Sequence, residues 1–166
     1  MKLLILGAGG HGQVVRETAQ ATGLFEEIAF LDDAAEDVLG KLEEFPRFLE
    51  EFDCAFVALG NPVLRREYQT RLESHGVRVP ALIHPRSIVS PTAKVGVGTV
   101  IMAGAVVQTG VKIGCGCILS AGAIVDHDAC LGDYCHINAG AVVPSMSAVP
   151  ENTKVDYGQV FCGLKK

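Results

Sequence analysis

The sequence contains no tryptophan, and aromatic residues make up only 6% of its 166 positions. It also contains no apolar run of about 18 residues, the length that indicates a membrane-spanning helix, so we expect no membrane partner. Basic residues are not in excess, because 14 Lys and Arg stand against 19 Asp and Glu, giving a net charge of −5. Sequence-independent nucleic-acid binding needs a dense basic surface, so we expect no nucleic-acid partner.

An export signal is also missing. The apolar residues 1–6 run directly into a glycine-rich segment, without the small-residue cleavage site of a secretory leader. We therefore predict a cytoplasmic protein whose six cysteines are reduced thiols. Cys115 and Cys117 have half the spacing of a zinc site, but we expect Cys117 to point inward as core packing, so we predict no metal.

What the sequence does contain changes in character near residue 80. Before that point, apolar strand-like runs alternate with segments of helical spacing, which is typical of a small parallel sheet. The predicted strands are residues 3–6, 28–31 and 55–59, and the predicted helices are residues 13–22 and 63–75. This set is too short for a complete six-stranded dinucleotide fold. We predict a Rossmann-like α/β domain over residues 1–80.

From residue 83 onward the sequence has a period of six. Every sixth residue from Ile83 to Val155 is aliphatic, and the residue four places after each one is small through Thr153, apart from Val111. A second period of 18 lies inside the first, because Ala-Gly-Ala recurs at residues 103–105, 121–123 and 139–141. A hexapeptide period predicts a parallel β-helix with three short strands per coil, and residues 83–154 give about four coils. We assign residues 81–166 to this domain and a C-terminal tail.

The loop at residues 7–12 fits G-x-G-x-x-G between a strand and a helix, and the acidic pair Asp32-Asp33 follows about 20 residues later. Backbone N–H groups of such a loop can hold phosphates at a helix N-terminus. Two other interpretations remain open, a tight strand-to-helix turn without a ligand and an NAD-binding sensor.

The strongest candidate for catalysis is His127, which lies between Asp126 and Asp128. Neutral imidazole can remove a proton from an amine or hydroxyl, and the adjacent carboxylate of Asp128 strengthens it as a base. His136 follows nine residues later, half a coil away, so the two histidines can meet only across a groove between subunits. The alternative is that both are ordinary surface histidines.

These motifs together resemble a known family. The hexapeptides resemble the left-handed β-helix acyltransferases, and the glycine loop with His11, Asp32-Asp33, Gly60-Asn61 and the His127 segment resembles the bacterial sialic acid O-acetyltransferases and UDP-4-amino-sugar N-acetyltransferases. That resemblance implies a homotrimer that transfers acetyl from acetyl-CoA directly to an amine or hydroxyl of a nucleotide-linked amino sugar or a sialic acid, with no metal.

The resemblance also implies roles for individual residues. His127 is the general base, Asp128 raises its basicity, and the other roles divide between two substrates. Acetyl-CoA is expected at His136, Ala139, Gly140 and Ser145, and the nucleotide-linked sugar at Gly9, Gly10, His11, Asp32, Asp33, Gly60 and Asn61.

One departure from the family pattern keeps a second function open. Members usually carry further coils after the histidine-containing turns, and about two coils fewer are expected here. The alternative is therefore a non-catalytic trimer that binds a sugar nucleotide and has lost the coenzyme A site.

Overall fold

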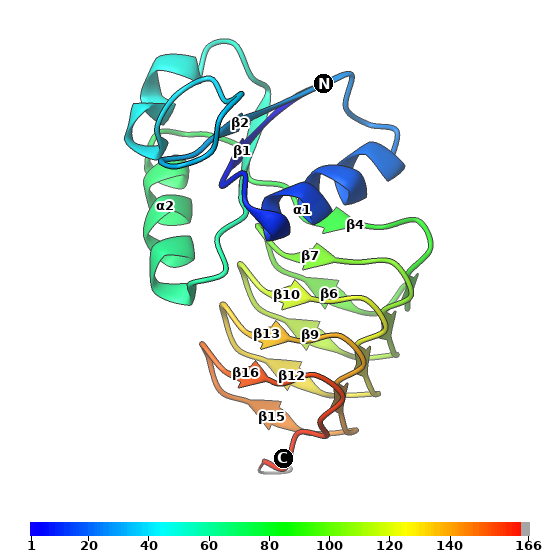
Figure 1. The fold of residues 1–166 in the computed structure, drawn as a ribbon. Helices are drawn as coiled ribbons and strands as arrows, with labels where there is room; N and C mark the ends of the chain where they lie inside the picture. Colours follow the sequence, from blue (N-terminus) through cyan, green and yellow to red (C-terminus); the bar gives the residue numbers. More distant parts are fainter. Residues whose placement is uncertain (164–166) are drawn as a thin grey trace. The chain divides into compact units, whose positions relative to one another are not determined.

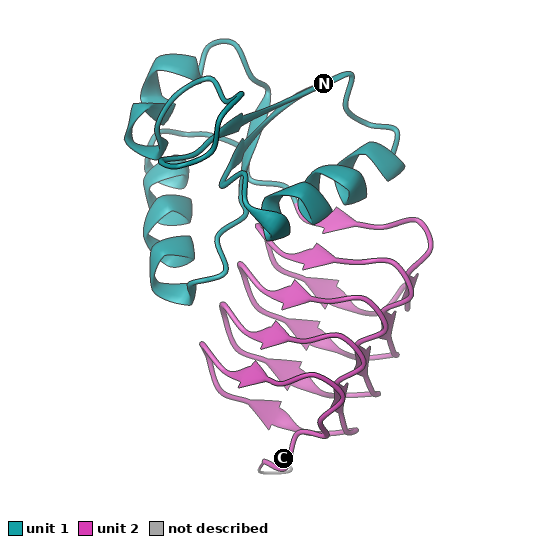
Figure 2. Cartoon of the chain, viewed as in Figure 1, with its two compact units in different colours: residues 1–80 teal, residues 81–166 magenta. Residues whose placement is uncertain are grey.

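The computed structural model describes residues 1–163, so the last three residues of the predicted tail, 164–166, lie outside it. The chain divides into two compact units, residues 1–80 and 81–166 (Figure 2). The elements of the first unit are β1 (Lys2–Leu6), α1 (Gly10–Ala21), β2 (Glu27–Leu31), the 3-10 helix η1 (Leu42–Phe48), β3 (Cys54–Val57) and α2 (Pro62–Ser74).

The first unit is built on a parallel sheet with the strand order β2-β1-β3. The central strand β1 is buried from Leu3 to Leu6, as its uninterrupted aliphatic sequence requires. Its core joins the sheet to η1 and α2 through Leu4, Leu31, Phe45, Val57 and Leu72. The predicted small parallel sheet is confirmed.

Two helices begin earlier than predicted. α1 begins at Gly10 rather than at residue 13, so part of the expected glycine loop is the first helical turn. α2 begins at Pro62, because proline suits the first helical position and Asn61 caps the helix. η1 was not predicted, since seven residues containing Pro46 are too few to show a helical period.

The second unit is a stack of two-residue strands (Figure 1). In chain order they are β4 (Leu82–Ile83), β5 (Ile88–Val89), β6 (Lys94–Val95), β7 (Val100–Ile101), β8 (Val106–Val107), β9 (Lys112–Ile113), β10 (Ile118–Leu119), β11 (Ile124–Val125), β12 (Cys130–Leu131), β13 (His136–Ile137), β14 (Val142–Val143), β15 (Ala148–Val149) and β16 (Lys154–Val155).

These strands form the three parallel sheets of a β-helix. Sheet B has the order β16-β13-β10-β7-β4, sheet C has β14-β11-β8-β5, and sheet D has β15-β12-β9-β6. Each strand pairs with the strand 18 residues away, as Ile118 pairs with His136. The predicted four coils are present, and sheet B carries one strand more.

Both predicted inward columns pack together in the core of this unit. The aliphatic column is buried at Ile101, Leu119 and Ile137, and the small column at Ala105 and Ala123, all at 0% exposure. The outward residues of the strands are therefore the ones left to bind partners or substrates.

No helix within residues 1–163 is both long enough and apolar enough to span a membrane.

Candidate functional site

The predicted substrate residues of the first unit all lie in loops that follow the carboxyl ends of its parallel strands. Ligands of open α/β sheets bind at this edge, where the strand order reverses, and here the reversal falls between β1 and β3. The residues are Gly9, Gly10 and His11 after β1, Asp32 and Asp33 after β2, and Gly60 and Asn61 after β3.

The glycines of the first loop divide into two kinds. Gly7 has φ +107°, and a Cβ there would lie 2.8 Å from the carbonyl oxygen of Ala58, so strand packing requires glycine. A Cβ on Gly12 would lie 2.0 Å from the carbonyl oxygen of Gly7. At Gly9 and Gly10, by contrast, an added Cβ would meet nothing within 4 Å. The space over these two exposed residues is open to a ligand.

Asp32 holds the glycine loop in place. Its Oδ2 accepts a hydrogen bond from the Ala8 N–H at 2.7 Å, and its Oδ1 accepts from Ala34 and Ala35 at 2.9 and 3.0 Å. The bond from Ala8 is the main reason why the pKa of this carboxyl lies below its ordinary value. Asp32 therefore supports the loop from β2 whether or not it also contacts a ligand.

Asp33 and Asn61 each fix the start of a helix. The Asp33 carboxylate accepts a hydrogen bond from the Leu42 N–H at 3.1 Å, at the first residue of η1. The Asn61 side-chain oxygen accepts from Val63 at 2.9 Å and from Leu64 at 3.2 Å. Both predicted substrate residues thus have a structural role, and their contact with a ligand stays a prediction.

Arg65 is a residue that the sequence analysis missed. It is 1% exposed, and its guanidinium donates to the carbonyl oxygens of Leu59 and Gly60 at 2.7 and 3.1 Å. A buried arginine thus fixes the loop after β3 while a Cβ on Gly60 would meet nothing within 4 Å. The sequence signal was a charged residue one turn after a helix cap, a pattern that by itself indicates a solvated face.

In the second unit, His127 and Asp128 form a hydrogen-bonded pair at the corner between sheets C and D. The distance from His127 Nδ1 to Asp128 Oδ2 is 3.0 Å, and the histidine side chain is 47% exposed. This bond, helped by the charge of Asp126, raises the pKa of His127 above its ordinary 6.5. With Nδ1 directed to Asp128, Nε2 is the nitrogen that can accept a proton.

Neighbouring coils hold this corner in place. The Asp128 N–H donates to the carbonyl oxygen of Thr109 at 2.9 Å, and the Met146 N–H donates to the carbonyl oxygen of His127 at 3.0 Å. Ser145, a predicted donor-binding residue, precedes Met146 and so lies on the coil that stacks against His127. The structure thus brings His127, Asp128 and Ser145 together.

The other predicted donor-binding residues lie elsewhere on the coil. His136 belongs to β13 in sheet B, and its Nε2 lies 3.2 Å from the hydroxyl oxygen of Ser120. Ala139 and Gly140 form the turn from sheet B to sheet C, where Gly140 has φ +68°. One chain therefore carries two half-sites at two corners, with sheet C between them.

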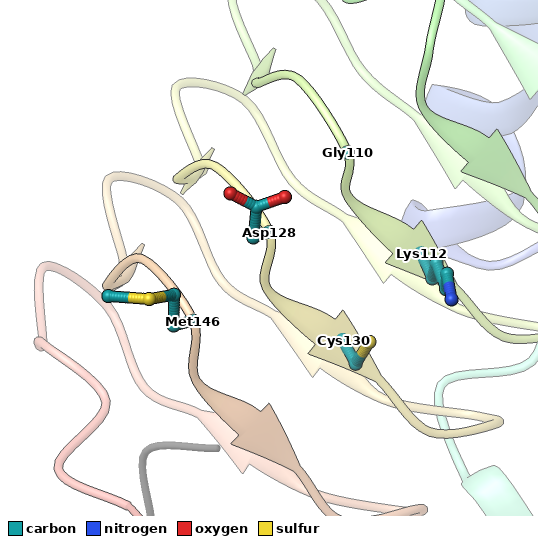
Figure 3. A pocket seen from close by; sticks show the side chains of 5 residues that line it. All are labelled: Gly110, Lys112, Asp128, Cys130 and Met146. Atoms are coloured by element: carbon teal, nitrogen blue, oxygen red, sulfur yellow. The ribbon is translucent and has the colours of Figure 1, made fainter.

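A pocket of about 290 Å³ lies beside the His127–Asp128 pair (Figure 3). It is lined by residues from three successive coils, namely Gly110, Lys112, Asp128, Cys130 and Met146. Only Asp128 was singled out as a site residue, although the period of 18 places Gly110 and Met146 directly beside it.

The buried cysteines are part of the core, as predicted. Cys117 and Cys135 are 0% exposed and pack in the inward column. Their thiols continue a hydrogen-bond ladder between coils: Thr99 donates to the Gly114 carbonyl at 2.9 Å, Cys117 to Gly132 at 3.2 Å, and Cys135 to Pro150 at 3.1 Å. The described residues contain no group of three or more His, Cys, Asp or Glu that could hold a metal ion.

Comparison with family models matches the two units separately. Residues 2–72 match the PglD N-terminal domain, and residues 110–145 match the bacterial transferase hexapeptide repeat. A curated relative, UDP-N-acetylbacillosamine N-acetyltransferase from Bacillus subtilis (strain 168), is 38% identical over 108 residues, which are 60% of this chain. The matched segment spans about half the length of that relative, 50%.

Solved structures extend the likeness to nearly the whole chain. The acetyltransferase domain of PglB from Neisseria gonorrhoeae FA1090 is 38% identical, with a TM-score of 0.92 over 96% of this chain and 81% of that one. The same domain has been solved with acetyl coenzyme A. A mutant of perosamine N-acetyltransferase from Caulobacter crescentus, in complex with CoA and GDP-perosamine, is 27% identical with a TM-score of 0.64, over 96% of this chain and 90% of that one. These matches confirm the predicted fold class, including the left-handed β-helix.

Proposed function

Because the chain belongs to the family of bacterial hexapeptide-repeat sugar acetyltransferases with a PglD-type N-terminal domain, we propose that it transfers an acetyl group from acetyl-CoA to the amine of a nucleotide-linked amino sugar. The names of the relatives, which act on bacillosamine and perosamine derivatives, support this class of acceptor over a free sialic acid. Both proposed substrates fit the cytoplasmic location predicted from the sequence.

The observation that carries the proposal is the His127–Asp128 pair beside a pocket. The sugar amine attacks the thioester carbonyl carbon, and Nε2 of His127 takes the proton that the amine loses. The carbon–sulfur bond then breaks, and the departing CoA thiolate receives that proton from the imidazolium. No acyl-enzyme forms, so the reaction requires only a base and the correct placement of two substrates.

Asp128 tunes and orients this base. Its carboxylate bonds Nδ1 at 3.0 Å, which fixes the ring with Nε2 outward and raises the pKa of His127. A stronger base accepts the amine proton more readily, as long as the pH keeps the imidazole neutral.

We assign the nucleotide of the acceptor to the first unit. The open space over Gly9 and Gly10 allows backbone N–H groups to approach phosphates closely, and the exposed Gly60 borders the same strand edge. His11 in the first turn of α1 and the acidic pair Asp32-Asp33 are the other proposed contacts.

We further propose that the active unit is a homotrimer assembled through the outer face of sheet C. The half-site with His136, Ala139 and Gly140 and the half-site with His127 and Ser145 flank this face, so only a second copy of the chain can bring them together. The outward residues of the face are all aliphatic and in register, namely Ile88, Val106, Ile124 and Val142. Acetyl-CoA is the substrate assigned to the groove that the two corners form.

The test is release of free CoA from acetyl-CoA in the presence of UDP-, dTDP- and GDP-linked 4-amino sugars. The wild type is expected to release CoA with at least one acceptor, and His127→Ala to lower kcat by about 100-fold or more. The variant should keep its thermal stability, because the side chain is exposed. His75→Gln, an exposed histidine at the end of α2, is the matched control.

Two outcomes would overturn the proposal. A wild-type protein that binds UDP but releases no CoA with any acceptor would be the non-catalytic sugar-nucleotide-binding trimer. A protein that binds NADH and not UDP would be neither.

A further inference from the structure

The outward column of sheet D changes character halfway along the stack. Its residues, in register from coil to coil, are Lys94, Lys112, Cys130 and Ala148. Two long cationic side chains are followed by two short ones, and the hollow forms where the column shortens. Sheet C, with its aliphatic outward residues, has no such change.

The two lysines are placed directly against each other. Lys94 and Lys112 are register partners on adjacent strands, about 4.8 Å apart, where like charges destabilise a sheet. Both are exposed, and within residues 1–163 neither ammonium forms an ion pair with a carboxylate. In a chain with a net charge of −5, this is a local excess of positive charge that an anion would neutralise.

The lysine pair is continuous with the pocket of the candidate site. Lys112 and Asp128 line the same pocket, and Cys130 lies beneath the hollow next to Lys112 (Figure 3). An elongated ligand lying along the coils therefore places one end beside Asp128 and His127 and the other beside the two ammonium groups.

We propose that Lys94 and Lys112 form a binding subsite for a phosphate or diphosphate group of one of the two substrates. The inference rests on the proposed function, in which acetyl-CoA and the nucleotide-linked sugar both carry a diphosphate. Two ammonium groups supply donors and two positive charges, and lysine binds phosphate as a compact charge. Neither residue belongs to the predicted donor or acceptor sites.

The test uses Lys112→Met, Lys94→Met and the double variant, which keep side-chain length and remove charge. Each single variant should raise the KM of the phosphate-bearing substrate by roughly tenfold, with kcat little changed at saturation. Lys112→Arg should restore much of the loss, and the effect should shrink at high salt. Lys154→Met on sheet B, whose ammonium lies 3.3 Å from Asp156, is the matched control.

The source of the phosphate follows from the substrate whose KM changes. S-acetylpantetheine lacks the phosphates of acetyl-CoA, so a subsite for the donor predicts that Lys112→Met does not affect its KM. A subsite for the acceptor predicts a raised KM for the nucleotide-linked sugar alone. Either pattern supports the proposal.

Direct binding separates this inference from the proposed function. Calorimetric titration with CoA and with UDP needs no catalysis, so a weakened affinity in Lys112→Met supports the subsite even if no acetyl transfer occurs. The subsite is wrong if neither affinity nor KM changes more than twofold. It is also wrong if the variants lose the oligomeric mass, since the lysines would then pair with carboxylates of a second copy.

Discussion

Asp128 and Met146 turn the same corner of consecutive coils with left-handed backbone, at φ 60° and 57°. In the coil before them the equivalent residue is Gly110, at φ 68°. Asp tolerates this conformation, whereas for Met it is a true outlier. Strained backbone of this kind concentrates at functional sites, and here it lies beside the proposed base.

The backbone strain predicts the effect of glycine at this position. Met146→Gly should stabilise the second unit by about 1 kcal/mol, because relief of the left-handed strain outweighs the extra chain entropy of glycine. Chemical denaturation measures this difference. Gly122→Ala is the converse variant, since φ is +70° there and an added Cβ meets no close atom, and it should cost about 1–2 kcal/mol. Equal stability of all three proteins would show that the corner is unstrained.

The His127–Asp128 bond predicts a shift in pH dependence. The base works only when neutral, so kcat/KM of the wild type should fall as the pH drops through the raised pKa of His127. Asp128→Asn removes the charge that raises this pKa, and asparagine also accepts a left-handed backbone. Its acid limb should therefore move to lower pH, while its maximal rate falls because the base is weaker. An unmoved acid limb would rule out Asp128 as the group that tunes His127.

The sequence predicted residues on the inward columns better than residues on the outer surface. Leu119 and Cys135 were placed in the core by period alone, because an inward position tolerates only aliphatic or small side chains. Lys112 was not singled out, because an exposed lysine satisfies any outward position. Arg65 was missed for the opposite reason, since burial of a charged side chain depends on distant carbonyl groups that no local pattern reveals.

At the scale of the element, η1 is joined to α2 by one carboxylate. Glu43 accepts two hydrogen bonds from the Arg71 guanidinium at 2.8 and 2.7 Å, and one from the Tyr68 hydroxyl at 2.7 Å. These bonds lower the pKa of Glu43 from 4.5 to about 2, with Arg71 the main cause. Such a link between segments 28 residues apart was not predictable from sequence, because η1 itself shows no period.

The lowered pKa predicts how acid affects this link. A carboxyl whose pKa is lower in the folded state stabilises the fold above its unfolded pKa of 4.5, and this contribution is lost as the pH falls toward about 2. Glu43→Gln should therefore be less stable at neutral pH, and its stability should fall less steeply over that window. Thermal denaturation at several pH values measures both effects. Glu67→Gln, whose carboxylate lies 3.9 Å from Arg71, serves as the control. Parallel pH curves for Glu43→Gln and the wild type would contradict the assignment.

At the scale of the whole molecule, the proposed trimer depends on the aliphatic face of sheet C. Ile88 and Ile124 are 68% and 38% exposed in the single chain, which is costly for aliphatic side chains in register. Light scattering should give three times the chain mass of 17.5 kDa for the wild type. Ile88→Glu with Ile124→Glu should reduce this mass and the rate of acetyl transfer together, whereas Thr70→Glu on α2 should change neither. A double variant that keeps its mass would exclude this face.

The β-helix also decides which changes of chain length the protein can tolerate. Each coil takes 18 residues, and outward and inward positions alternate within each strand. Deleting one residue before β12 would turn every later outward side chain, His136 included, toward the core. Inserting 18 residues would keep all three faces intact and only displace His127 from Lys94 by one further coil, about 4.8 Å. Length variation among functional relatives should therefore come in whole coils, with the reading frame of the faces conserved more strictly than the number of coils.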